Sequence, residues 1–240
     1  MTYTKYNEFT LVMKKLVKNQ LKILSIICSF AGIIICLITA KFDGYSHPTK
    51  RLLYFTNQSN IWIFIIMILC FFKVFRKNEY NEYSLFVARY IFTISILLTG
   101  VFFCCFLGPK ADKSYHAFSV SGVLLHIFVP LFALLDFLLE KKRFFINKKV
   151  AFCSLLPPLI YLFLTTVLFF FNIDFGRGEN FPYFFFNYFS PAGIFGFSKI
   201  LPYFMGSFYW VVLLLILLII FAFLLRKINN KFYLKRNKST

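Results

Sequence analysis

Six long apolar runs alternate with short polar connections along the chain. Each run is about 20 residues long, and an α-helix of that length, rising about 1.5 Å per residue, crosses the roughly 30 Å hydrocarbon core of a bilayer. The pattern predicts an all-α polytopic membrane protein, with residues 1–240 forming a single bundle of six transmembrane helices. The expected spans are about residues 21–40, 52–75, 85–106, 119–139, 151–171 and 203–225.

Composition agrees with this pattern. The chain is 60% hydrophobic and 15% charged, whereas soluble domains are about 45–50% apolar and about 25% charged. The 27 Lys and Arg against 9 Asp and Glu give a net charge of +18. In a soluble protein this excess would suggest nucleic acid. Here the basic residues lie in short connections, so we expect contacts with anionic lipids on the cytoplasmic side and no nucleic-acid partner.

The basic residues also predict the orientation of the bundle. The N-terminal arm, the second and fourth connections and the C-terminal tail carry most of the Lys and Arg. Cytoplasmic loops of membrane proteins are enriched in these residues. We therefore expect both termini in the cytoplasm of a multi-pass protein of the cell membrane, with the first, third and fifth connections facing outward. The oligomeric state is not predicted.

The densest polar cluster within the spans opens the second one. Thr56, Ser59 and Asn60 are spaced i, i+3, i+4, which places them on one helix face, and Asn57 lies beside them. One interpretation is an N-terminal cap with interhelical hydrogen bonds. The other is a hydroxyl nucleophile, Thr56, with substrate-binding amide and hydroxyl groups from Asn57, Ser59 and Asn60.

The fourth span carries a histidine, His126, on the same helical face as other small and polar residues. With helix starts near Leu52 and Phe118, Thr56 lies about 6 Å deep and His126 about 12 Å. A shift of one helical turn would bring them to one level. A hydroxyl within reach of a neutral imidazole is the minimal pair for nucleophilic catalysis, although a buried histidine more often serves packing.

Two further features complete the polar inventory. Asp136 lies about 15 Å along the helix from His126, too far to orient the ring, and is expected to pair with Arg89 unless both side chains extend to the interface. The aromatic fifth connection, 172–202, is either a lid over a lipid tail or an aromatic belt. The His, Asp and Cys residues have no metal-ligand spacing, so no metal or cofactor is expected.

Three short segments, in chain order, carry a family resemblance: Tyr54-Phe55-Thr56, Leu125-His126 followed by Val129-Pro130, and Phe181-Pro182-Tyr183-Phe184-Phe185. Together they resemble the androgen-induced-protein family of multi-span membrane hydrolases and its bacterial six-span relatives. The animal members hydrolyse fatty acid esters of hydroxy fatty acids with an intramembrane threonine and a histidine, which match Thr56 and His126. The resemblance thus implies a bacterial membrane protein without a cofactor. The polar Asn57-Gln58-Ser59-Asn60 segment departs from the more apolar animal pattern and points to another lipid ester or to no hydrolase activity.

The sequence therefore favours an intramembrane hydrolase of a lipid-like ester, with Thr56 as the nucleophile and His126 as the acid and base near the outer leaflet. Asn57 or Asn60 is the expected oxyanion donor. Two other hypotheses stay open. One is a small-solute transporter whose path is lined by the same polar stripe, and the other is a non-catalytic integral membrane or lipid-binding protein.

Overall fold

The computed structural model describes residues 2–72, 79–107 and 118–237, and this part of the chain is all-helical. Six helical segments in it are long and apolar enough to cross a membrane, which confirms the predicted all-α class and the six spans. The α-helices are α1 (Thr2–Thr39), α2 (Phe55–Phe72), α3 (Glu79–Phe102), α4 (Val120–Val123), α5 (Val129–Leu138), α6 (Lys148–Cys153), α7 (Leu156–Phe170) and α8 (Ser207–Asn237). Two π-helical segments, Phe103–Leu107 and Leu124–Phe128, and two 3-10 turns, Pro48–Leu53 and Phe184–Phe186, complete the described helices.

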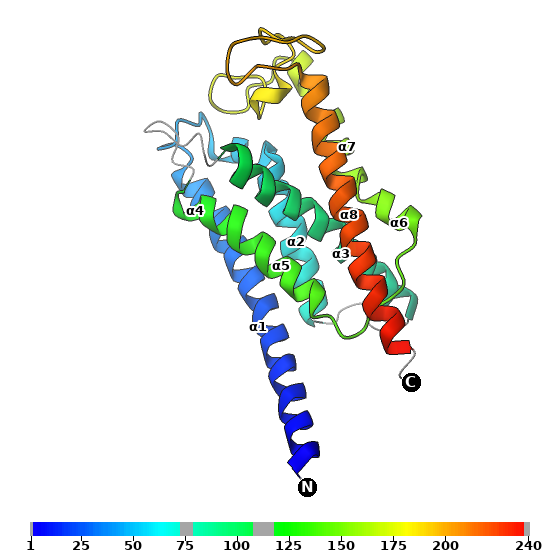
Figure 1. Cartoon of the computed structure of the whole chain (residues 1–240). Coiled ribbons are helices and arrows are strands. Elements are labelled where there is room, and N and C mark those ends of the chain that lie inside the picture. The colour runs from blue at the N-terminus through cyan, green and yellow to red at the C-terminus, as the bar shows by residue number, and fades with distance from the viewer. Residues whose placement is uncertain (1, 73–78, 108–117, 238–240) are drawn as a thin grey trace.

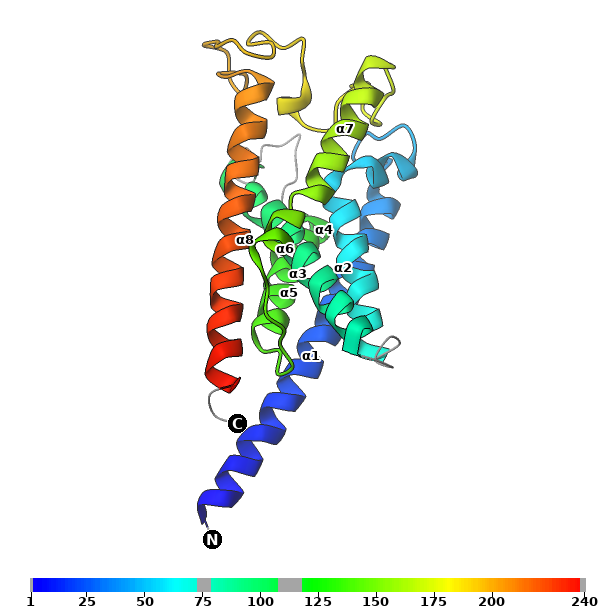
Figure 2. The same cartoon turned by 90° about the vertical axis from the view of Figure 1, so that its right-hand side faces the viewer.

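The helices form an elongated bundle. Helices α1, α2, α3 and α5 pack against one another, and α8 packs on α3 and α6. Both chain termini lie at one end of the bundle, and the connection between α7 and α8 lies at the other, in both views (Figures 1 and 2). We call this second end, which carries residues 40–54 and 171–206, the loop end.

The second and sixth spans begin later than expected. Residues 48–53 form a 3-10 turn that His47 caps by accepting a hydrogen bond from the Thr49 backbone, so α2 starts at Phe55 and Thr56 lies in its first turn. Thr56 therefore does not lie a full helical turn inside α2, as the expected start at Leu52 implied. Helix α8 starts at Ser207 instead of residue 203 and continues past residue 225 to Asn237. Residues 73–75 of the second expected span lie outside the described residues.

The fifth span is interrupted, which the sequence analysis did not predict. Helix α6 ends at Cys153 and α7 begins at Leu156. Pro157 and Pro158 follow the break. Proline has no backbone N–H and its ring clashes with the carbonyl four residues earlier, so the helix cannot run straight through this point.

A stripe of small and polar residues on α1 faces the bundle. Ser25 and Ser29 are fully buried and Cys36 is buried. A Cβ on Gly32 would lie 2.6 Å from Leu125 Cδ2, so only glycine lets α1 approach the π-helical segment this closely. Much of α8 is exposed on the outside of the bundle.

A cluster of four charged residues is buried at the C-terminal end of α5. Lys22 Nζ lies 2.7 Å from Asp136 Oδ1, and Arg89 pairs with the other oxygen of Asp136. Arg89 Nη1 also lies 2.5 Å from Glu140 Oε2. The expected Arg89–Asp136 pair is confirmed, and Lys22 and Glu140, which the sequence analysis did not assign to it, balance its charge.

Candidate functional site

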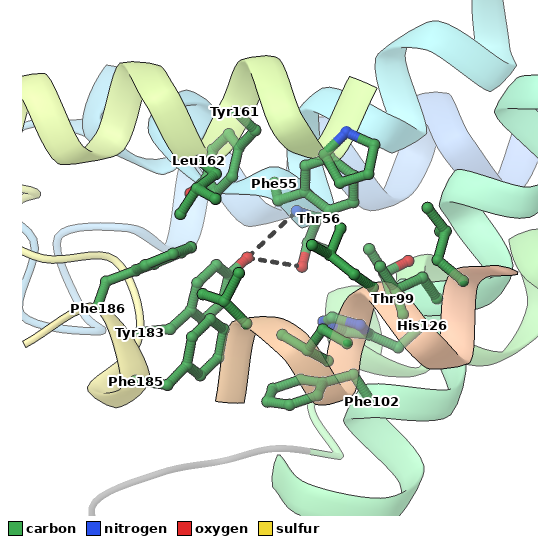
Figure 3. Close-up of a pocket in the computed structure, with 16 residues that line it drawn as sticks. Phe55, Thr56, Thr99, Phe102, His126, Tyr161, Leu162, Tyr183, Phe185 and Phe186 are labelled. Carbon is green, nitrogen blue, oxygen red and sulfur yellow. Dashed lines mark hydrogen bonds between the residues drawn. The ribbon is translucent and has the colours of Figure 1, made fainter. Parts of the chain in front are cut away.

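Two cavities meet inside the loop end of the bundle. The first, about 80 Å³, is apolar and lies between α2, α3, α7, α8 and residues 183–186 (Figure 3). The second, about 300 Å³, is polar and opens among the connections of the loop end. Of the described residues, three line both cavities: Thr56, His126 and Tyr183.

Thr56 lies at the N-terminus of α2, beneath the connection that follows α7. Its backbone N–H donates to the Tyr183 hydroxyl at 3.3 Å, and the two hydroxyl oxygens, Thr56 Oγ1 and Tyr183 Oη, are also 3.3 Å apart (Figure 3). A helix N-terminus carries unpaired N–H groups and a partial positive charge. The Thr56 side chain therefore lies where negative charge is stabilised.

His126 lies in the π-helical segment Leu124–Phe128, and the sequence explains why the helix widens there. Pro130 has no N–H to donate to the His126 carbonyl four residues earlier. The N–H of Val129 instead donates to the Leu124 carbonyl, which is the wider π-helical spacing. This geometry leaves the Leu125 carbonyl without its normal helical donor.

The His126 ring is held on one face by an aromatic neighbour. It stacks on Phe103 with ring centroids 4.2 Å apart and planes at 9°. The ring also interacts with the backbone of Thr99. Within the part of the chain that the structure describes, the buried Nδ1 atom has no hydrogen-bond partner. Phe103 and Thr99 thus fill the orienting role for which the sequence offered no candidate.

Asn60 connects the backbones on which Thr56 and His126 lie. Its Nδ2 donates to the Thr56 carbonyl at 2.8 Å and to the Leu125 carbonyl at 3.2 Å. The second bond satisfies the carbonyl that the π-helical geometry releases. Asn60 is fully buried and lines neither cavity.

The other two residues expected to contact substrate take different positions. Ser59 is fully buried and donates to the Thr56 carbonyl at 3.0 Å, so it and Asn60 make the contacts of the structural interpretation. Asn57 lines the polar cavity and donates to the Arg51 carbonyl at 2.8 Å. Of the three, Asn57 is the one that faces a cavity.

Thr56 and His126 face the same two cavities, and no hydrogen bond joins them directly within the described ranges. Nucleophile–base contacts in ligand-free enzymes are often long and tighten when substrate binds. Figure 3 shows the His126 ring and the Thr56 hydroxyl on adjoining walls of the apolar cavity.

Tyr183 is a site residue that the sequence analysis did not select. It stacks on Phe185, with centroids 5.2 Å apart, and meets Tyr54 edge-on at 5.7 Å. The available signal was its place in the Phe181-Pro182-Tyr183 segment. Among so many aromatic residues, nothing in the pattern distinguished this hydroxyl from an interfacial belt.

Asp174 shapes the connection that leads to Tyr183. Its carboxylate accepts hydrogen bonds from the N–H groups of Gly176 at 2.7 Å and Gly178 at 3.0 Å, and from the Ser46 hydroxyl at 3.1 Å. The bond from Gly176 is the main cause that lowers the pKa of this carboxyl. Gly176 has a φ of 113° and Gly178 a φ of 77°, values that favour glycine.

No metal centre accompanies the site in the described residues. They contain no group of three or more His, Cys, Asp or Glu side chains able to hold a metal ion. Asp112 and His116, two potential ligands from the sequence, lie outside the described residues.

No protein-family model, curated protein or solved structure matches this chain. The functional interpretation therefore depends on the geometry of the two cavities and of the three residues that they share.

Proposed function

We propose that this protein is an intramembrane hydrolase of lipid esters, with Thr56 as the nucleophile and His126 as the general base and acid. The observation that carries the proposal is that Thr56, His126 and Tyr183 line both an apolar and a polar cavity. An ester lipid has an acyl chain on one side of its carbonyl and a polar group on the other. Such a molecule would place the first carbons of its chain in the apolar cavity and its carbonyl at the boundary.

The chemistry follows from the positions of these groups. Neutral His126 accepts the Thr56 hydroxyl proton as Oγ1 attacks the ester carbonyl, and it returns the proton to the departing alcohol. Water from the polar cavity then hydrolyses the acyl-threonine. The Tyr183 hydroxyl accepts the Thr56 N–H and lies 3.3 Å from Thr56 Oγ1, which places it next to the oxyanion that forms when Thr56 attacks. The Asn60 amide nitrogen donates to two carbonyls, and the Asn57 amide nitrogen donates to the Arg51 carbonyl and to Cys36 Sγ, which favours Tyr183 for this role.

The proposal includes an orientation and a family. The excess of Lys and Arg at the end with the termini supports a cytoplasmic location for that end in the cell membrane, and the resemblance to bacterial six-span relatives suggests a bacterial protein. The loop end and the site would then lie in the outer leaflet. The three segments that resemble androgen-induced-protein hydrolases include Thr56, His126 and Tyr183, the three residues shared by the cavities, which supports membership of that family.

A fluorophosphonate probe tests the proposal because it reacts covalently with activated hydroxyl nucleophiles. We expect the purified protein in detergent to be labelled, and peptide mass spectrometry to place the adduct on Thr56. A folded protein that stays unlabelled, or that is labelled elsewhere, would contradict the mechanism. Uptake of a solute into liposomes without its consumption would favour the transporter hypothesis instead.

Asn60→Ala tests the connection between the two helices. We expect the kcat for ester hydrolysis to fall more than about tenfold with little change in KM, since small displacements of reacting groups carry large rate costs. Ser59→Ala is the matched control because Ser59 donates to the Thr56 carbonyl but forms no hydrogen bond with Leu125 in the described part of the chain. Kinetics are measured below the melting temperature of each variant. Equal losses in the two variants would contradict a specific role for Asn60.

Tyr183→Phe removes one oxygen atom next to Thr56. If the hydroxyl donates to the oxyanion, kcat should fall about 10²-fold, the usual cost of losing such a donor. Tyr188→Phe is the control, because the Tyr188 hydroxyl contacts Thr166 at 2.6 Å and lines neither cavity. Unchanged turnover in Tyr183→Phe would assign the oxyanion contact to another donor.

A further inference from the structure

The polar cavity that Thr56 lines also contains two guanidinium groups, both beside the Tyr45 ring. Arg51 Cζ lies 4.2 Å and Arg177 Cζ 4.6 Å from the centroid of the Tyr45 ring. All three side chains line the cavity that Thr56 also lines. Two cations beside one ring repel each other, and an anion bound near both would offset that repulsion.

The described carboxylates do not form ion pairs with both guanidinium groups of this cavity. Asp43 is ion-paired with Arg51 and also accepts the Thr39 hydroxyl at 3.0 Å. Even so, Arg51 Nε is buried and has no hydrogen-bond partner in the described ranges. Arg177 forms no ion pair with any carboxylate that the structure describes.

Arg177 is held in place by its own connection. It lies between Gly176 and Gly178, whose N–H groups are both bound by the Asp174 carboxylate. Lys50 Nζ donates to the Asp174 carbonyl at 2.6 Å, which attaches the same turn to the residues that precede α2. The backbone of Arg177 therefore lies in a hydrogen-bonded turn, and its exposed guanidinium packs on the Tyr45 ring.

We propose that the polar cavity binds the phosphate of a phospholipid head group, with Arg51 and Arg177 as its ligands. Planar guanidinium groups match phosphate oxygens in bidentate geometry. The cavity of about 300 Å³ is also larger than a lone carboxylate needs. Glu179, which lines the same cavity, would face the amine of a zwitterionic head group.

The order of groups along a glycerophospholipid matches the order of groups in the site. Such a lipid carries its phosphate, its glycerol ester and its acyl chain in sequence. The polar cavity, Thr56 and the apolar cavity follow in the same sequence. This inference rests on the proposed hydrolase function and names its substrate class. Water would cleave the acyl C–O bond, releasing a fatty acid and a phospholipid that bears a free hydroxyl.

Binding of ether lipids tests the head-group site without requiring hydrolysis. The probes share one alkyl chain and differ in the group on glycerol: a phosphocholine, a carboxylate or no charge. Glycerophosphate without a chain serves as the free phosphate. Calorimetry measures the binding of each probe to the protein in non-ionic detergent. The proteins compared are wild type, Arg177→Gln and the control variant Lys199→Gln. Lys199 is an exposed residue of the same connection and lines neither cavity.

We expect the phosphocholine ether lipid to bind at least about tenfold more tightly than the carboxylate and uncharged lipids, and more tightly than glycerophosphate. Arg177→Gln should lower the affinity for the phosphocholine lipid about tenfold, because it removes one charge-assisted contact, and Lys199→Gln should leave that affinity unchanged. Equal binding of the three lipids, or unchanged binding in Arg177→Gln, would overturn the inference. Binding of glycerophosphate as tight as that of the lipid would assign the site to free phosphate.

The outcomes separate this inference from the proposed function. If the phosphate preference depends on Arg177 but no ester is ever hydrolysed, the hydrolase proposal fails and the phosphate site remains. If esters are hydrolysed by Thr56 without any preference for phosphate, the head-group inference fails and the hydrolase remains.

Discussion

Replacing either Thr56 or His126 by alanine should lower kcat/KM for ester hydrolysis by at least about 10³-fold. Removing the nucleophile or the base of such a pair commonly costs at least that much, and the losses are not additive because the two groups act as a unit. The double variant should therefore be no slower than the slower single variant. The measurement is steady-state hydrolysis of a fluorogenic lipid ester by purified protein.

Controls must separate chemistry from folding. Thr166 lies on α7 and lines neither catalytic cavity, and its hydroxyl bonds the Leu162 carbonyl and the Tyr188 hydroxyl. The variant Thr166→Ala should therefore retain hydrolytic activity. Thr56→Ser keeps the nucleophilic oxygen and should retain measurable turnover. Full hydrolysis by a well-folded Thr56→Ala protein would show that another group attacks the ester.

Asp136→Ala should destabilise the protein by about 3–5 kcal/mol, the usual cost of removing one partner from a buried ion pair. Asp136 is fully buried and bonds both Lys22 and Arg89. Without it, two buried cations share Glu140, which contacts Arg89. The measurement is the free energy of unfolding in mixed micelles, together with the melting temperature in detergent.

Glu82→Ala is the matched control for Asp136→Ala. Glu82 pairs with Lys142, whose side chain is 60% exposed, so this substitution should cost no more than about 1 kcal/mol. A loss at Asp136 as small as that at Glu82 would show that the buried cluster contributes little to stability.

Most of the helical architecture was predictable because transmembrane helices leave a strong local signal. Runs of about 20 apolar residues have few alternatives in a bilayer, where backbone groups must hydrogen-bond within the segment. The ends of the helices were less predictable. Leu52 is apolar enough to belong to α2, but Pro48 and the His47 cap place it in a 3-10 turn. Asn229 and Asn230 keep α8 helical beyond residue 225 through contacts with Phe144 and Ile146.

The candidate site was predictable in part, for a physical reason. Polar side chains are costly within apolar spans, so Thr56, Asn57, Ser59, Asn60 and His126 stood out without any knowledge of the fold. Their individual positions did not follow from that cost. The i, i+3, i+4 spacing is the same whether a side chain faces a cavity or bonds a backbone carbonyl. Only the packing of α2 on the π-helical segment places Asn60 against Leu125 and leaves Asn57 facing the cavity.

Local sequence patterns were enough to predict the helical class of this protein, its six apolar spans, its charge asymmetry and the short list of polar residues inside the spans. These properties depend on local composition and on the cost of transferring each segment into a bilayer. The tertiary structure decided which distant groups meet. It brings Tyr183 to Thr56 across 127 positions of sequence and places both, with His126, where an apolar and a polar cavity join. Such contacts arise from helix packing and from the return of a connection over the bundle, which no local pattern specifies.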